Sequence, residues 1–129
     1  MILLDTHVAI WLADEVEKIS KPASQAIRVR GAKEGIGIAA ITLFEVAWLI
    51  HRGKVQFPGT LEAVLDEMSA RYTVVPINAQ IAAIATQFPD DFPGDPGDRL
   101  IGATALSLGA TLITRDEKMR QYSRLQTVW

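Results

Sequence analysis

Four acidic residues lie where a predicted strand passes into a helix or a turn: Asp5, Glu45, Asp98 and Asp116. In a parallel α/β sheet the carboxyl ends of the strands share one edge, and ligands bind at that edge. Residues that are far apart in the sequence can therefore meet there. Four carboxylates in one place repel one another unless a cation neutralises them, and Mg²⁺ and Mn²⁺ prefer such oxygen ligands. Metal ions held by carboxylates are suited to cutting phosphodiesters.

Each of these acids also has a purely structural explanation, and the sequence leaves it open. Thr42 and Glu45 match a capping box, and the three aspartates occupy positions where an aspartate caps a helix. Capping predicts acidic residues at helix starts. It does not predict that they follow buried strands and converge on one edge of a sheet. Convergence therefore distinguishes a functional site from four separate helix caps.

Four further residues are candidates for supporting roles at this edge: Thr6, Asp95, Arg99 and Thr114. Asp95 is a candidate fifth ligand, with a turn-forming role as the alternative. The hydroxyls of Thr6 and Thr114 could bond a ligand carboxylate or a metal-bound water, or only the local backbone. Arg99 could hold the carboxylate cluster or an RNA phosphate, with a surface salt bridge as the alternative.

Other residues with chemical potential have weaker support. His7 is a candidate general base, but we expect a structural histidine with its hydrogen bonds satisfied. Arg52 and Lys54 are candidates for phosphate contacts, with a solvated basic patch as the alternative. Trp11 and Trp48 are expected to pack in the core, and a protein interface is the alternative. The two histidines lack zinc-ligand spacing, and the sequence has no phosphate loop, dinucleotide fingerprint or serine-hydrolase elbow.

The composition is that of one folded domain spanning residues 1–129, with 49% hydrophobic residues. The absence of cysteine excludes disulfides and thiolate metal sites, and it fits a reducing, cytoplasmic setting. We expect no signal peptide and no membrane span. The net charge of −2 is unusual for a nucleic-acid binder, but without the four candidate acids the basic residues outnumber the acidic ones.

Strands alternate with helices along the chain, which predicts an α/β fold: a three-layer α/β/α sandwich with a mainly parallel central sheet. The expected strands are 2–4, 35–40, 72–76, 110–114 and an edge strand at 125–129. The expected helices are 7–13, 20–33, 42–52, 60–70, 78–87, 98–108 and a short one from residue 116. Residues 88–97 contain three prolines and two glycines and are expected to form a loop.

These motifs resemble those of the PIN domain family, specifically the small VapC-type toxins of type II toxin–antitoxin pairs. The similarity covers essentially the whole chain, and the order and spacing of the motifs make it specific. The matching segments are Leu-Leu-Asp-Thr-His (3–7), Ala-Ile-Thr-Leu-Phe-Glu-Val-Ala (40–47), Gly-Lys-Val (53–55), Asp-Pro-Gly-Asp-Arg-Leu-Ile-Gly-Ala-Thr-Ala (95–105) and Leu-Ile-Thr-Arg-Asp-Glu (112–117).

The resemblance implies a metal-dependent endoribonuclease in which Asp5, Glu45, Asp98 and Asp116 hold Mg²⁺ or Mn²⁺. It also implies a homodimer, an RNA substrate and a small VapB-like antitoxin partner. Two other functions stay open: a non-catalytic PIN-like module that binds RNA or a partner, and a metal-dependent DNA nuclease or phosphoesterase. No residue of the candidate site recognises a 2′-hydroxyl, so the choice of RNA over DNA follows from the resemblance alone.

Overall fold

The computed structural model describes residues 1–129 and contains one five-stranded sheet with the order β3-β2-β1-β4-β5. Every neighbouring pair of strands is parallel. The predicted α/β fold with a mainly parallel sheet is therefore confirmed. The strands are β1 (Ile2–Leu4), β2 (Ile36–Ala39), β3 (Thr73–Val75), β4 (Thr111–Ile113) and β5 (Thr127–Val128).

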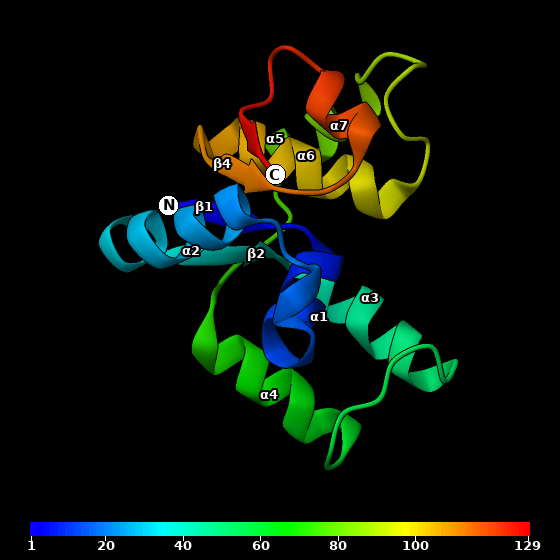
Figure 1. Cartoon of the computed structure of the whole chain (residues 1–129). Coiled ribbons are helices and arrows are strands. Elements are labelled where there is room, and N and C mark those ends of the chain that lie inside the picture. Colours follow the sequence, from blue (N-terminus) through cyan, green and yellow to red (C-terminus); the bar gives the residue numbers. More distant parts are fainter.

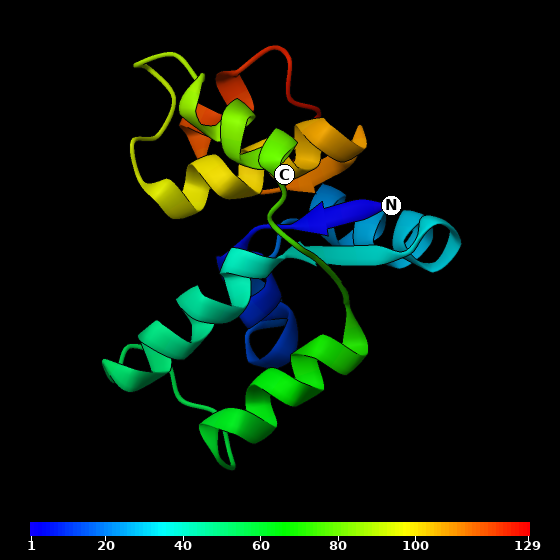
Figure 2. The same ribbon diagram turned by 180° about the vertical axis from the view of Figure 1, so that it is seen from behind.

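Both faces of the sheet are covered by helices, as Figures 1 and 2 show from opposite sides. Side chains alternate along β1, so that Leu3 belongs to one buried cluster while Ile2 and Leu4 belong to another. All three side chains are fully buried. A strand with both faces covered is apolar throughout, which explains its uninterrupted Ile-Leu-Leu sequence.

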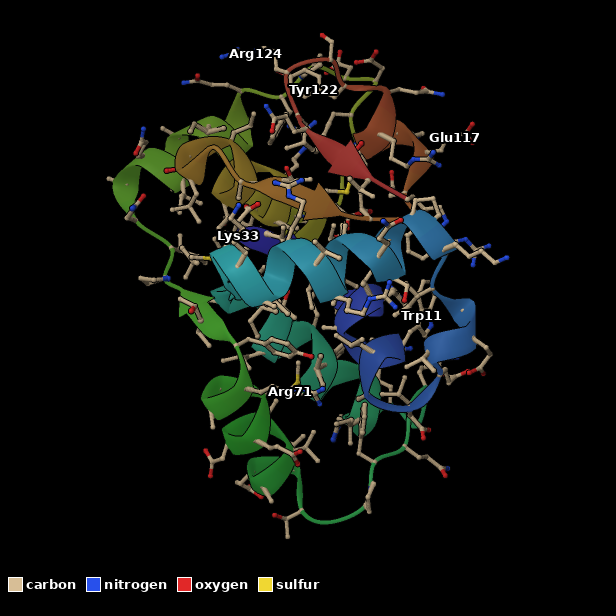
Figure 3. All side chains as sticks on the ribbon, turned by 60° about the vertical axis from the view of Figure 1, so that its left-hand side comes forward. Trp11, Lys33, Arg71, Glu117, Tyr122 and Arg124 are labelled. Carbon is tan, nitrogen blue, oxygen red and sulfur yellow. The ribbon has the colours of Figure 1, made fainter.

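Different helices contribute to the two clusters. The cluster around Leu3 contains buried side chains from α5 (Ala79–Thr86), α6 (Pro96–Leu108) and α7 (Glu117–Gln121). The cluster around Ile2 contains side chains from α1 (Thr6–Asp14) and α2 (Lys21–Glu34), which precede and follow a 3₁₀ turn, η1 (Val16–Lys18). Figure 3 shows α2 lying across this face of the sheet. None of the helices is long and apolar enough to cross a membrane.

The remaining helices, α3 (Ala40–His51) and α4 (Leu61–Arg71), extend away from the sheet and are joined by the segment 52–60 (Figure 1). α3 begins directly at the end of β2, so its N-terminus lies at the carboxyl edge of the sheet. α1 follows β1 in the same way, after the single residue Asp5. The edge formed by the ends of β1, β2 and β4 is therefore surrounded by helix N-termini.

Several predicted caps are confirmed because their side chains accept the expected backbone hydrogen bonds. Ser20, Thr60 and Asn78 accept from the amides three residues later, at 3.2, 3.2 and 2.9 Å. Gly109, with φ of 61°, ends α6 in the left-handed conformation that favours glycine.

Two predicted helix starts are wrong, and both bear on the site. α3 begins at Ala40 rather than Thr42, so Thr42 and Glu45 do not form a capping box. α6 begins at Pro96 rather than Asp98, because proline favours the first helical position and Asp95 accepts a 2.7 Å bond from the Gly97 amide. Asp95 is thus the cap of α6, and Asp98 lies inside its first turn.

Candidate active site

Asp5 joins β1 to α1 and is almost fully buried, with 8% of its surface exposed. One carboxylate oxygen accepts a 2.8 Å bond from the Thr6 amide, and the other accepts a 2.6 Å bond from the Thr114 hydroxyl. Burial raises the pKa of Asp5 above its usual value, although these two hydrogen bonds oppose that shift. Asp5 therefore caps α1 and is also tied to the end of the neighbouring strand.

Asp116 follows β4, the strand next to β1, and caps the short helix α7. Its carboxylate accepts a 2.9 Å bond from the Met119 amide. Its own amide donates a 3.0 Å bond to the Thr114 hydroxyl, which in turn donates to Asp5. A single buried hydroxyl thus links the two aspartates that follow adjacent strands.

Glu45 lies in the second turn of α3, and its carboxylate accepts a 2.6 Å hydrogen bond from the Thr6 hydroxyl. The Thr42 hydroxyl lies 3.0 Å from the same Thr6 oxygen. Because the only hydroxyl proton of Thr6 is directed at Glu45, Thr42 is the donor in that pair. Burial raises the pKa of Glu45, and the nearby charges of Asp95 and Asp5 act in the same direction.

Asp98, in the first turn of α6, is the third of these acids with a raised pKa. Burial, and to a lesser extent the negative charges of the surrounding carboxylates, together raise its pKa from 3.8 to about 7. Those charges come from Asp5, Asp95, Glu45 and Asp116. Asp5, Asp98 and Asp116 line one hollow at the carboxyl edge of the sheet, and Glu45 and Asp95 line a neighbouring one. Glu45 and Asp98 cap no helix, which the capping explanation alone does not account for.

Two adjoining hollows carry these carboxylates, and His7 lines both. One, with a volume of ≈ 360 Å³, is lined by Asp5, His7, Val8, Trp11, Asp98, Arg115 and Asp116. The other, of ≈ 420 Å³, has Glu45, Asp95 and the aromatic rings of Phe44 and Trp48 among its lining residues. No three His, Asp or Glu side chains are close enough together to coordinate one ion. Asp5, Glu45 and Asp116 instead bond to hydroxyl or amide groups.

Some lesser candidates are not where the sequence suggested. We expected a structural histidine with its hydrogen bonds satisfied, but His7 is exposed, and its ring centroid lies 5.9 Å from that of Trp11. Arg99 contacts no carboxylate. Its guanidinium donates to three carbonyls of the preceding loop, at Pro93 (2.9 Å), Phe88 (3.3 Å) and Pro89 (3.4 Å), and to the carbonyl of Ala85 in α5 (3.3 Å). Arg99 therefore holds the loop that leads into α6.

Sequence reasoning missed the cationic and aromatic wall of the first hollow. The guanidinium of Arg115 lies 5.8 Å from the centroid of the Trp11 ring, within cation–π range. Trp11 also contacts Trp129 at 5.9 Å. Trp11, which lies on α1, is thus part of the wall of the site and also packs against the buried cluster around Ile2. The only feature of the sequence that pointed to this wall was the position of Arg115 directly before Asp116.

Comparison with known proteins agrees with this geometry. The sequence pattern of the PIN domain matches residues 2–125. The chain belongs to the PIN domain family. It is 39% identical over 130 residues to Ribonuclease VapC22 of Mycobacterium tuberculosis (strain ATCC 25618 / H37Rv), covering 99% of this chain and 98% of that protein.

Solved structures share the fold of this PIN domain at lower identity. VapBC2 from Rickettsia felis, bound to a DNA fragment from its promoter, superposes with a TM-score of 0.72 at 20% identity, over 98% of this chain and 97% of that one. VapBC-1 from nontypeable Haemophilus influenzae gives a TM-score of 0.72 at 24% identity, over 98% and 96% of the chains. Both similarities support the three-layer α/β/α architecture.

The donor set of this PIN domain fits a hard divalent cation. The four converging side chains offer only carboxylate oxygens, which Mg²⁺ and Mn²⁺ prefer over nitrogen or sulfur. Burial is the main cause of the raised pKa of Asp98, and the negative charges of the nearby carboxylates raise it further. A positive charge at this position would favour the ionised form of Asp98. PIN domain ribonucleases depend on metal in general, and this site has the charge to hold one.

Proposed function

We propose that this PIN domain is a divalent-metal-dependent endoribonuclease that hydrolyses RNA phosphodiester bonds. In this proposal it acts in the cytoplasm as the toxin of a type II toxin–antitoxin pair. The observation that carries the proposal is the grouping of Asp5, Asp98 and Asp116 in one hollow, with Glu45 in the neighbouring one, at the sheet edge where α/β proteins bind ligands. The 39% identity to a protein named Ribonuclease VapC22 supports RNA as the substrate.

In this proposal Asp5, Glu45, Asp98 and Asp116 hold Mg²⁺ or Mn²⁺. A divalent cation held there supplies Lewis-acid chemistry, activating water and offsetting the charge that develops on the phosphoryl oxygens. The chain's own contribution is to hold the carboxylates in place. The Thr114 hydroxyl orients Asp5, the Thr6 hydroxyl orients Glu45, and Asp95 caps the helix that carries Asp98.

The rim of the site has groups suited to binding the substrate's phosphates. Arg115 and His7 line the same hollow as Asp5, Asp98 and Asp116. A guanidinium makes strong, charge-assisted hydrogen bonds to phosphate oxygens. We assign Arg115 to binding a phosphate next to the scissile one. His7 lines both hollows and therefore lies between them.

The test of this function is cleavage of a mixed pool of transfer and ribosomal RNA, with a single-stranded DNA in parallel. The protein is assayed with Mg²⁺, with Mn²⁺ and with EDTA. We expect discrete RNA products that require metal and fall by about 100-fold or more in Asp98→Asn. Asp91→Asn, an exposed loop aspartate, is the matched control and should cleave like the wild type.

Each alternative function gives a different result in this assay. RNA binding without products, in every metal condition, would favour a non-catalytic binding module. Cleavage of DNA in preference to RNA would favour a DNA nuclease. Cleavage that persists in EDTA, or in a folded Asp98→Asn protein, would reject the metal-carboxylate site itself.

The partners in this proposal are a VapB-like antitoxin and a second copy of the chain. Two proteins that share its fold are named VapBC, which supports an antitoxin of the VapB type. We expect the protein encoded beside this gene to co-purify with the chain and to suppress RNA cleavage. We also expect light scattering to give the mass of a homodimer. Neither result affects the assignment of the carboxylate site.

A further inference from the structure

Three near-parallel rings line the outer face of α3, in positions four and three residues apart. The centroids of Phe44 and Trp48 are 6.2 Å apart with an interplanar angle of 14°. Those of Trp48 and His51 are 6.0 Å apart with an angle of 29°. Phe44 is 62% exposed and Trp48 is 49% exposed, so the expectation that Trp48 packs in the core is wrong. We call Phe44, Trp48 and His51 the aromatic ladder.

The aromatic ladder is continuous with the carboxylate site. Phe44 and Trp48 line the ≈ 420 Å³ hollow that also contains Glu45, Asp95 and His7. A volume of this size is in the range of sites for small ligands, about 300–1,000 Å³. One molecule in this hollow would contact an aromatic ring and lie beside a site carboxylate. An exposed aromatic patch that lies next to the site carboxylates indicates a binding surface.

Positive charge follows the aromatic ladder along the chain. The guanidinium of Arg52 lies 5.7 Å from the centroid of the Trp48 ring, and Lys54 comes two residues later. Neither cation takes part in the ion pairs of the structure, which involve the N-terminus, Lys18 and Arg30. Both are therefore free to meet an anionic ligand. The surface thus combines exposed rings, free cations and access to the carboxylates.

These features together are those of a surface for single-stranded nucleic acid, in which bases stack on aromatic rings and cations follow the backbone. A second copy of the chain fits them less well, because protein interfaces are enriched in aromatic residues and arginine but depleted of lysine and glutamate, and this surface includes Lys54 and Glu45. Covering this face with protein would also remove Glu45 and Arg52 from water. A base in a duplex has both faces covered by its neighbours, so the aromatic ladder suits an unpaired base.

We infer that the aromatic ladder is a base-stacking subsite that holds an unpaired nucleotide of the RNA beside the scissile phosphate. Arg52 and Lys54 would then follow the phosphate backbone as it leaves the site. This inference rests on the proposed ribonuclease function, and it names the form of RNA that the site selects. Stacking tolerates every base, so the subsite selects for lack of pairing rather than for sequence.

The test measures binding separately from cleavage. Asp98→Asn protein in EDTA is titrated with a fluorescently labelled oligouridine and with an RNA duplex of the same length. In this background we expect Trp48→Ala to weaken binding of the single strand by about 10-fold or more. Duplex binding should change much less. Trp48→Phe, which keeps a ring, should retain most of the affinity.

Val29→Ala is the matched control, since Val29 is also a large exposed apolar residue but lies on α2. Equal single-strand binding by Trp48→Ala and Val29→Ala, with both variants folded by circular dichroism, would overturn the inference. A change from dimer to monomer in Trp48→Ala, with RNA binding unchanged, would also overturn it and make the aromatic ladder an interface between copies.

A second measurement uses the active protein with Mg²⁺ and an RNA that has an unpaired loop. We expect Trp48→Ala to raise KM by about 10-fold with little change in kcat, because the ring binds a base but does not touch the reacting phosphate. A fall in kcat with unchanged KM would contradict the subsite. If the wild type does not cleave but its single-strand binding depends on Trp48, the nuclease proposal fails and the subsite stands.

Discussion

The hydroxyl of Thr114 donates a 2.6 Å hydrogen bond to Oδ2 of Asp5, joining residues 109 positions apart in the sequence. The same hydroxyl accepts a 3.0 Å bond from the Asp116 amide. Thr114 is fully buried at the end of β4, and Asp5 follows the adjacent strand β1. Thr6 plays a similar part for Glu45 on the other side of the site. Two threonine hydroxyls therefore hold two of the four site carboxylates.

Thr114→Val should destabilise the protein and impair cleavage. Valine has nearly the same shape but leaves an oxygen of the buried Asp5 carboxylate without its donor, at a cost of about 1–3 kcal/mol in the free energy of unfolding. We expect RNA cleavage to fall by about 10-fold. Thermal melting and cleavage rates measure the two effects, and Thr114→Ser should restore most of both.

The control for this variant is Thr104→Val, which removes another buried hydroxyl, one that donates only to a carbonyl of its own helix at 2.7 Å. Its cleavage rate should match that of the wild type. If Thr104→Val and Thr114→Val lose activity equally, the bond to Asp5 has no special role.

Gly97→Ala should displace Glu45 while leaving the fold in place. A Cβ at position 97 would overlap Oε2 of Glu45 and lie 2.8 Å from its Cδ and 3.0 Å from Oδ1 of Asp95. Only glycine allows this close approach. We expect the Glu45 side chain to swing away, its bond with Thr6 to break, and RNA cleavage to fall by about 10-fold or more.

Gly94→Ala is the matched control, because a Cβ there meets nothing within 4 Å. The comparison needs only cleavage rates and circular dichroism of the two purified variants. Wild-type activity in Gly97→Ala would mean that the position of Glu45 does not matter for the reaction.

Asp98 should make the metal-free protein less stable as the pH rises. Its pKa is about 7 in the folded protein, whereas an unperturbed aspartate, as in the unfolded chain, has a pKa of 3.8. Between these values the folded state binds a proton that the unfolded state releases, so the free energy of unfolding falls as the pH increases from about 4 to about 7. The raised pKa values of Asp5 and Glu45 act in the same direction.

Asp98→Asn should therefore be more stable than the wild type at pH 8 in EDTA, by about 1–2 kcal/mol after allowing for solvent screening of this partly exposed side chain. Chemical denaturation at pH 5 and pH 8 measures the difference. We expect the advantage of Asp98→Asn to shrink at pH 5. An identical pH dependence in both proteins would show that Asp98 titrates normally.

Arg99→Gln should loosen the loop before α6. The guanidinium bonds four carbonyls between residues 85 and 93, and glutamine cannot reach them all. We expect a loss of about 1–3 kcal/mol in the free energy of unfolding and faster amide exchange in this loop. Arg28→Gln, an exposed arginine on α2, should melt close to the wild type. Unchanged exchange in the loop would refute this role.

The sequence by itself determined most of the architecture. Short apolar strands alternate with helices whose caps are local signals, because a cap depends on a side chain and a backbone amide two or three residues apart. The parallel sheet, the bounds of α2, α4 and α5 to within one residue, and the PIN domain resemblance were all readable from such local patterns. The four site acids could be named because each is close to the end of a strand or the start of a helix.

The tertiary structure alone decided which polar side chains form contacts beyond their own helix caps. The residues around Thr42 match the pattern of a helix cap, yet α3 begins two residues earlier. The Thr42 hydroxyl instead forms a hydrogen bond with that of Thr6 in another helix. Arg99 follows Asp98 directly, yet its guanidinium turns to the loop carbonyls. Trp48 was as apolar as any core residue, yet it lies on the surface beside the carboxylates. Such contacts depend on how the tertiary structure brings elements together, and a local pattern holds no information about partners that lie 6 to 14 residues away across a loop, as for Arg99, or 36 residues away in another helix, as for Thr42.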